Sequence, residues 1–238
     1  IGEAVTTIGS RAFASMTSLT TINFNAKSCG DLTSSSELFY SSTTATSDIT
    51  LNIGENVTRI PAYLLAVSST TYNKVTSKIK TLYFKNLASV HEFGMNCFAN
   101  SAITTIYANG SMDDWFDITF GSMDSSPMNY STAKLWVTNR GASGTDGNTT
   151  TTTYDSKTFY KITKLVTPSD ITEIKAYQFM YFAQFISITI TDNVTSIKNY
   201  GLYNCSSVKN LIIGDGVVSI DYRALSYFRS LEYLVIGS

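Results

Sequence analysis

The chain has very little of the side-chain chemistry that enzymes use. Its 238 residues include one histidine, His91, and three cysteines. A Cys–His nucleophile pair would need His91 beside Cys29 or Cys97, but Cys97 precedes Phe98 in an apolar stretch, where a buried thiol is inert. The sequence also has no glycine-rich phosphate loop, no paired histidines and no closely spaced cysteine ligands. We therefore expect no catalytic residue, no metal and no cofactor.

Charge is also scarce. Charged residues make up 15% of the sequence and the net charge is −1, so the chain lacks the long-range field that draws proteins to nucleic acid or anionic lipid. Its apolar runs are too short to span a bilayer, and the sequence shows no signal peptide. It thus predicts no nucleic-acid partner and no membrane insertion within this chain.

The sequence does have apolar residues at a fixed period. Between Thr167 and Ile236 the same positions recur every 23 residues, with gaps of 3, 5, 6, 3 and 2 inside each repeat. The recurring sets are Ile171, Val194, Val217; Ile174, Ile197, Ile220; Phe179, Leu202, Leu225; Phe185, Val208, Leu231; Ile188, Leu211, Leu234; and Ile190, Ile213, Ile236. A period of about 20 to 29 residues with such apolar positions is typical of a leucine-rich-repeat solenoid.

The predicted fold is an α/β, β-rich solenoid with a right-handed coil and about nine repeats of roughly 23–30 residues. Each repeat has a main strand, such as residues 19–24, whose alternate side chains point inward. A turn, a second short extended stretch and a brief helical turn follow, because too few residues remain for a long helix. We expect the main strands to form a single parallel sheet in which Ile190, Ile213 and Ile236 stack in one column.

The same frame predicts which residues form the core. Cys205 takes a position that other repeats fill with residues such as Phe182, so it is predicted to be a small core residue, as is Cys97. Cys29 lies in a loop of Ser, Gly and Asp, where an exposed position is expected. Residues of the helical turns are predicted core anchors: Phe13, Leu202 and Leu225.

The two ends of the chain fall at the same point of the repeat. Ile1 lies 23 residues before Phe24, in the place of the last strand residue of a repeat, and Ile236 holds that place near the other end. Solenoids normally shield their terminal repeats with polar caps, and neither end has one. We therefore expect a piece of a longer repeat protein, with the signal peptide and anchor outside it.

The repeat frame is interrupted in the middle of the chain and returns at Ile162. The prediction is a single leucine-rich-repeat domain over residues 1–238, with an insert at about 109–137 and a flexible loop at about 140–156. The loop is predicted from its glycines and five successive threonines. Trp115 in the insert has two interpretations, the lining of a ligand pocket or a plug over the broken repeat. Large aromatics in irregular inserts usually pack inward, so we predict a plug.

Short phrases recur through the repeats, such as Ile53-Gly-Glu-Asn-Val57-Thr-Arg-Ile60 and Ser18-Leu19-Thr-Thr-Ile22. The interruption adds Trp115 and, further on, Phe120-Gly121 and Ser126-Pro127-Met128. Together these features resemble the BspA-like leucine-rich repeats, found on surface proteins of host-associated anaerobic bacteria and some parasitic protists. Two departures are Ser-Pro-Met where the family module has Asn-Pro-Leu, and the long loop after the module.

The resemblance implies a secreted or cell-surface protein and brings no catalytic motif. From it we expect a non-catalytic, extracellular protein-binding and adhesion scaffold of a host-associated bacterium. The expected partner is a host or matrix protein, and a glycan stays open. The alternative is a carbohydrate-binding module or an accessory repeat domain of a larger secreted enzyme.

The outward residues of the main strands are the candidate ligand surface. In one predicted row Tyr83, Tyr107 and Trp136 follow one another, which would expose three rings about 5 Å apart. Tyrosine and tryptophan are favoured at protein-binding hot spots, and such rings also stack on sugars. The competing interpretation is that this face is only scaffold, because its many threonines suit any strand.

Overall fold

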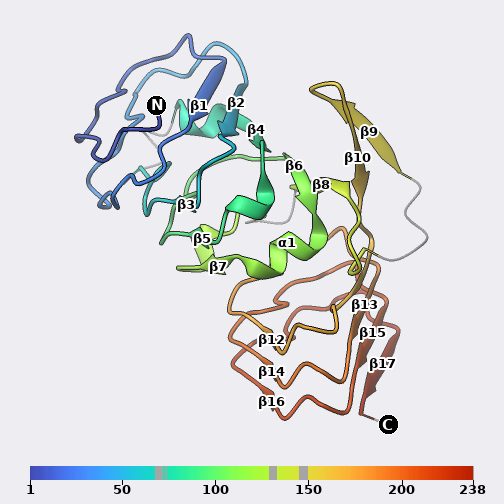
Figure 1. Cartoon of the computed structure of the whole chain (residues 1–238). Helices are drawn as coiled ribbons and strands as arrows, with labels where there is room; N and C mark the ends of the chain where they lie inside the picture. Colours follow the sequence, from blue (N-terminus) through green and yellow to red (C-terminus); the bar gives the residue numbers. More distant parts are fainter. Residues whose placement is uncertain (68–71, 73, 129–132, 145–149, 238) are drawn as a thin grey trace. The chain divides into compact units, whose positions relative to one another are not determined.

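The chain folds into two compact units (Figure 1). The computed structural model describes residues 1–67, 72, 74–128, 133–144 and 150–237. Unit 1 comprises Ile1–Asn109 and Phe120–Pro127, and unit 2 comprises Gly110–Thr119 and Met128–Ser238. This division does not test the single leucine-rich-repeat domain predicted over residues 1–238, which stays a prediction. The insert predicted at about 109–137 is divided between the two units.

Unit 1 is built from main strands that pair in parallel, one per repeat. They are β1 (Thr21–Phe24), β2 (Ile49–Ile53), β4 (Ile79–Phe84) and β6 (Thr105–Ser111), whose last two residues belong to unit 2. Thr21, Thr50, Thr81 and Thr105 lie side by side in register, as the sequence predicted. The unit's strand alternation therefore places equivalent residues of successive repeats in columns.

Short second strands and single turns complete the repeats of unit 1. Strands β3 (Arg59–Ile60) and β5 (Glu92–Phe93) pair in parallel. The backbone N–H of Gly121, just after β7 (Thr119–Phe120), donates to the Phe93 carbonyl over 2.9 Å. Three turns of 3-10 helix are η1 (Thr76–Lys78), η2 (Leu87–Ser89) and η3 (Met123–Ser125).

Unit 2 repeats this plan with two parallel sheets. Its main strands are β11 (Lys164–Val166), β13 (Ser187–Ile190), β15 (Asn210–Ile213) and β17 (Tyr233–Ile236). The second strands are β12 (Glu173–Ile174), β14 (Ser196–Ile197) and β16 (Ser219–Ile220), and they lie on the other side of the same coils (Figure 1). The predicted column of Ile190, Ile213 and Ile236 is confirmed.

The prediction of a single parallel sheet is wrong. The described strands form four sheets, and an antiparallel hairpin interrupts the parallel series in unit 2. It consists of β9 (Thr151–Tyr154) and β10 (Lys157–Lys161), and β10 also pairs antiparallel with β8 (Lys134–Asn139). Strand β10 therefore takes the place beside β8 that the sequence frame gave to β11.

The predicted loop over residues 140–156 holds only in part. Residues 151–154 form β9, because Asp155 and Ser156 both adopt left-handed backbone angles, φ 46° and 59°, as a two-residue hairpin turn requires. Earlier in this range the Asp113 carboxylate accepts hydrogen bonds from the backbone N–H groups of Ala142 and Ser143, at 2.6 and 2.8 Å. Residues 145–149 lie outside the described part of the chain.

The predicted helical turns are not helices. Within the described residues the one α-helix is α1 (Met112–Asp117), which begins with a capping box of Ser111 and Asp114. Elsewhere the turn carries left-handed residues such as Tyr177 and Tyr200, φ 62° and 57°. Their N–H groups donate to carbonyls of the next repeat, as Tyr200 does to Tyr222 over 3.1 Å. Bonds between repeats thus offset a conformation that costs about 1 kcal/mol or more per residue.

The core follows the apolar columns. Leu202 is fully buried, whereas Phe13 and Leu225 at equivalent positions are half-buried. Cys97 and Cys205 are fully buried, as predicted. Cys29, expected to be exposed, is 3% exposed, because its loop folds back onto the repeat: the neighbouring Gly30 N–H donates to the Thr6 carbonyl over 2.9 Å.

Leu202→Ala is expected to lower the free energy of unfolding by about 2–5 kcal/mol, because it leaves a cavity in a fully packed site. Leu225→Ala is the matched control at the same place of the next repeat. Its loss should be smaller, since that side chain is already half-exposed. Denaturant unfolding followed by circular dichroism measures both, and equal losses would contradict this packing.

Ser156→Gly is expected to stabilise the β9–β10 hairpin by about 1 kcal/mol, because glycine adopts a positive φ without steric cost. Amide hydrogen exchange of the hairpin should slow by about fivefold. Thr158→Gly, in the adjoining strand, should speed the exchange instead. A hairpin that exchanges at the same rate in both variants would show that its turn geometry does not limit its stability.

Candidate binding surface

The predicted row of three exposed rings is not present. Tyr83 is 3% exposed, and Tyr107 and Trp136 are half-buried. Tyr83 and Tyr107 lie in register on β4 and β6 in unit 1, whereas Trp136 is in unit 2. Alternation correctly places Tyr83 on the strand face opposite Leu82 and Phe84, but both faces of β4 are covered at that point. The exposure predicted for Tyr83 is therefore wrong.

Trp136 lies among lysines rather than among other aromatic rings. Along β8 the half-buried Lys134, Trp136 and Thr138 alternate with the buried Leu135 and Val137. On the antiparallel neighbour β10, Lys161 stands directly opposite Trp136, and its Nζ lies 5.9 Å from the centre of the indole ring. We call the surface of Lys134, Trp136 and Lys161 the Lys–Trp face.

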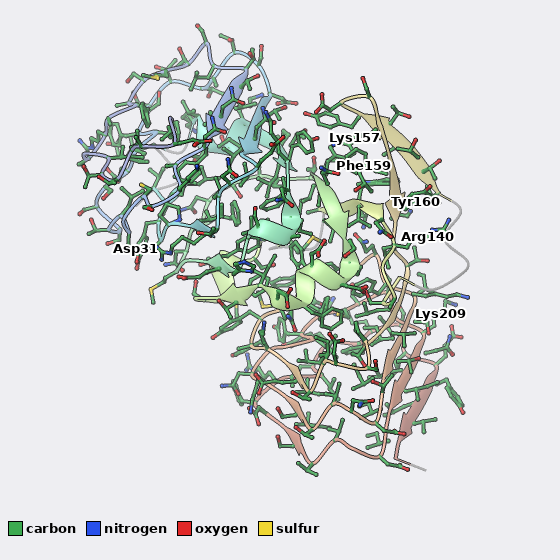
Figure 2. The ribbon with its side chains drawn as sticks, in the orientation of Figure 1. Asp31, Arg140, Lys157, Phe159, Tyr160 and Lys209 are labelled. Carbon is green, nitrogen blue, oxygen red and sulfur yellow. The ribbon has the colours of Figure 1, made fainter. Side chains whose placement is uncertain are left out.

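Among the residues that the structure describes, no carboxylate pairs with the positive charges of the Lys–Trp face. Burial, together with the charge of Lys161, lowers the pKa of Lys134 below its ordinary value. Neither lysine forms an ion pair with any residue that the structure describes. The same holds for Arg140, which follows β8, and for Lys157 at the start of β10 (Figure 2). The Arg140 guanidinium lies 4.8 Å from the centre of the Tyr160 ring. The face therefore attracts anionic groups.

A buried glutamine fixes the strand that carries Trp136. The Gln184 side chain accepts a hydrogen bond from the Leu135 N–H over 2.8 Å. Its amide nitrogen donates to the carbonyls of Leu135 and Ile162, at 3.2 and 2.8 Å. These three bonds satisfy backbone groups where the regular strand pairing stops, and they hold Leu135 inward. Trp136 is consequently presented from a rigid strand.

The Trp115 plug is confirmed. Trp115 is fully buried, and its indole N–H donates to the Gln178 carbonyl over 2.8 Å. Lys175 donates through Nζ to the carbonyls of Phe116 and Asp117, at 2.7 and 3.0 Å, which satisfies the C-terminal end of α1. Burial lowers the pKa of this lysine. A polar hollow of about 350 Å³ lies beside this lysine, whose ammonium is already bonded to the two carbonyls of α1.

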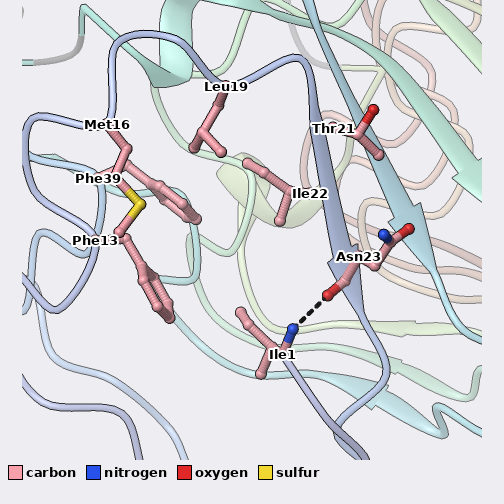
Figure 3. A pocket seen from close by; sticks show the side chains of 8 residues that line it. All are labelled: Ile1, Phe13, Met16, Leu19, Thr21, Ile22, Asn23 and Phe39. Atoms are coloured by element: carbon pink, nitrogen blue, oxygen red, sulfur yellow. Dashed lines mark hydrogen bonds between the residues drawn. The ribbon is translucent and has the colours of Figure 1, made fainter.

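An apolar hollow of about 230 Å³ lies in the first repeat of unit 1 (Figure 3). The N-terminal ammonium of Ile1 donates to the Asn23 carbonyl over 2.7 Å at its edge. Its lining residues are Ile1, Phe13, Met16, Leu19, Thr21, Ile22, Asn23 and Phe39. Most of these are apolar positions of the repeat frame, so the hollow continues the repeat core and offers no group of converging polar atoms.

Among the described residues, the cysteines are buried and the one histidine is exposed. Burial raises the pKa of the Cys97 and Cys205 thiols well above the ordinary value, and burial also raises that of Cys29, which disfavours the reactive thiolate. His91 is exposed. Across residues 1–67, 72, 74–128, 133–144 and 150–237, no three His, Cys, Asp or Glu side chains gather as metal ligands. No helix in that part of the chain is long and apolar enough to span a bilayer.

Comparison with known proteins identifies the repeats. A sequence model of the BspA type leucine-rich-repeat region matches residues 1–123 and 148–238 in six copies, against about nine repeats expected from the apolar frame. The chain therefore belongs to the BspA-type leucine-rich-repeat family.

One solved structure is similar over most of the chain. It is a leucine-rich cell surface protein from Faecalibacterium prausnitzii A2-165, 15% identical, covering 98% of this chain and 70% of that one with a TM-score of 0.41. No curated protein matches the chain. The functional interpretation below therefore rests on the family and on the Lys–Trp face.

Sequence reasoning missed Lys161 as a neighbour of Trp136. The repeat frame placed β8 next to β11, and Lys134 next to Lys164, whereas the hairpin puts β10 beside β8. A local signal was present: the pair Asp155-Ser156 is flanked by Thr, Tyr and Phe, which favour strands. The threonine run obscured it because low-complexity sequence also suits a loop.

Gln184→Met should lower the free energy of unfolding by about 2–4 kcal/mol, because it leaves the Leu135 N–H and two carbonyls without partners. Asn210→Met is the control, since Asn210 is exposed on β15 and should change stability by less than about 0.5 kcal/mol. Denaturant unfolding measures both. Comparable losses in the two variants would mean that the Gln184 bonds are dispensable.

Proposed function

We propose that this chain is a non-catalytic, extracellular protein-binding and adhesion scaffold of a host-associated bacterium. Its BspA-type repeats support a surface location, since the sequence resembles repeats of bacterial surface proteins. The observation that carries the binding role is the Lys–Trp face, where an indole stands beside two lysines that have no ion-pair partner among the described residues. A preformed face binds without the entropic cost of ordering a loop.

The proposed partner is a protein of the host or its matrix. Tryptophan is enriched among the residues that dominate protein interfaces. Binding of a glycan through a row of stacked rings is less well supported, because Tyr83 is buried and Trp136 stands beside a lysine. A carbohydrate-binding module, or an accessory domain of a larger secreted enzyme, is the alternative function.

The non-catalytic part of the proposal rests on the state of the reactive groups. All three thiols are buried and have raised pKa values, so none is poised as a nucleophile. Two buried glutamines of unit 2, Gln178 and Gln184, donate hydrogen bonds to backbone carbonyls. Their positions suit a scaffold rather than a reaction centre.

The immobilised chain should bind at least one member of a panel of purified host and matrix glycoproteins, and Trp136→Ser should weaken that binding at least about tenfold. Surface plasmon resonance measures the dissociation constant. Tyr233→Ser is the control, because Tyr233 is 54% exposed on β17 of the same unit and lies outside the Lys–Trp face. Binding to a glycan panel alone, or equal losses in the two variants, would overturn the proposal.

A further inference from the structure

We propose that the Lys–Trp face binds an extended acidic segment of a partner protein, with carboxylates at alternate positions of that segment. This inference rests on the proposed protein-binding function and specifies the chemistry of the partner. Three observations carry it: the placement of the two lysines, the local excess of positive charge, and the environment of the indole.

The spacing of the lysines matches an extended polypeptide. Lys161 lies opposite Trp136, and Lys134 precedes Trp136 by two residues on the same face of β8. Lys134 and Lys161 are therefore diagonal neighbours on an antiparallel pair, a placement with a backbone separation of about 7–8 Å. Side chains two positions apart on an extended strand are about 7 Å apart. Two carboxylates at alternate positions can thus meet both ammonium groups together.

The charge of this region is opposite to that of the whole chain. Residues 133–166 contain five Lys or Arg side chains and two Asp side chains, although the complete chain has a net charge of −1. The lysines of the Lys–Trp face have no carboxylate partner among the described residues, and the charge of Lys161 disfavours the charged form of Lys134. Bound carboxylates relieve this repulsion, and the lysines' partial burial limits screening by salt.

The indole favours a polypeptide over a sugar. A neutral sugar would leave the Lys161 ammonium, 5.9 Å from the centre of the Trp136 ring, without an anionic partner, whereas an acidic polypeptide supplies one. The Lys161 ammonium and the Trp136 ring therefore form a cation–aromatic pair, which keeps the charge of Lys161 near the surface. A carboxylate that pairs with Lys161 also brings the apolar part of a Glu side chain against the exposed part of the indole.

The test uses two labelled twelve-residue peptides that differ only in having Glu or Gln at alternate positions. Fluorescence anisotropy with the whole chain should give at least about tenfold tighter binding of the Glu peptide. The double variant Lys134→Gln, Lys161→Gln should lose that preference, and the charge-keeping double variant Lys134→Arg, Lys161→Arg should retain it within about threefold. Thermal unfolding confirms that each variant is folded.

A matched control removes the same net charge elsewhere. Lys80→Gln with Lys85→Gln, in unit 1, should leave binding of the Glu peptide within about threefold, because the effect is local rather than a consequence of net charge. Equal binding of the two peptides, or equal losses in the two Gln double variants, would falsify the proposal. Binding of a uronic-acid oligosaccharide without binding of the Glu peptide would overturn it in favour of a glycan.

The outcomes separate this inference from the proposed function. If a panel protein binds, and Trp136→Ser weakens it but the lysine variants do not, the acidic-segment inference fails while the protein-binding function stands. If the Glu peptide binds through the lysines but no panel protein binds, the inference of an acidic-segment site stands. The proposal that the partner is a host or matrix protein then fails.

Discussion

The structure depends on the register between successive repeats, because a 23-residue repeat cannot bury its apolar face alone. Equal spacing sets each residue against its equivalent, so that Ile190, Ile213 and Ile236 share one column. Backbone bonds between repeats then complete the turns: the Phe179 N–H donates to the Gly201 carbonyl over 2.7 Å, in a turn whose flanking Tyr177 has a positive φ. The local strain is tolerated because a buried N–H without a partner costs more.

Where the repeat is interrupted, side-chain amides replace the bonds that a neighbouring repeat supplies elsewhere. Gln178 donates to the Phe116 carbonyl at the end of α1, and Gln184 pairs with both backbone groups of Leu135. Trp115 fills the apolar space between them in unit 2 with its one polar atom satisfied. The parallel sheets on either side of such an insert stay regular, because the glutamine side chains are long enough to hydrogen-bond the backbone groups that have no strand partner there.

The same interruption creates the chemistry of the candidate surface. Regular repeats of this chain present mostly hydroxyl and amide side chains, which bind a partner weakly through any single contact. The hairpin brings Lys161 across from Trp136 and leaves Lys134 beside them, so that charge and an aromatic ring meet at one place. Gln184 holds β8 through three hydrogen bonds, and β10 follows a tight turn. A surface that is ordered before binding loses less conformational entropy when a partner binds.

The sequence by itself determined the repeat, its columns, the burial of Cys97 and Cys205 and the inward packing of Trp115, because periodicity and residue type decide which side chains face a core. Only the tertiary structure decided that Tyr83 is covered, that the turns are left-handed rather than helical, and that Lys161 neighbours Trp136. A two-residue period tells which face of a strand a residue occupies, but what covers that face depends on elements distant in the chain. Turn conformation and hairpin placement likewise depend on hydrogen bonds between repeats, which no local pattern records.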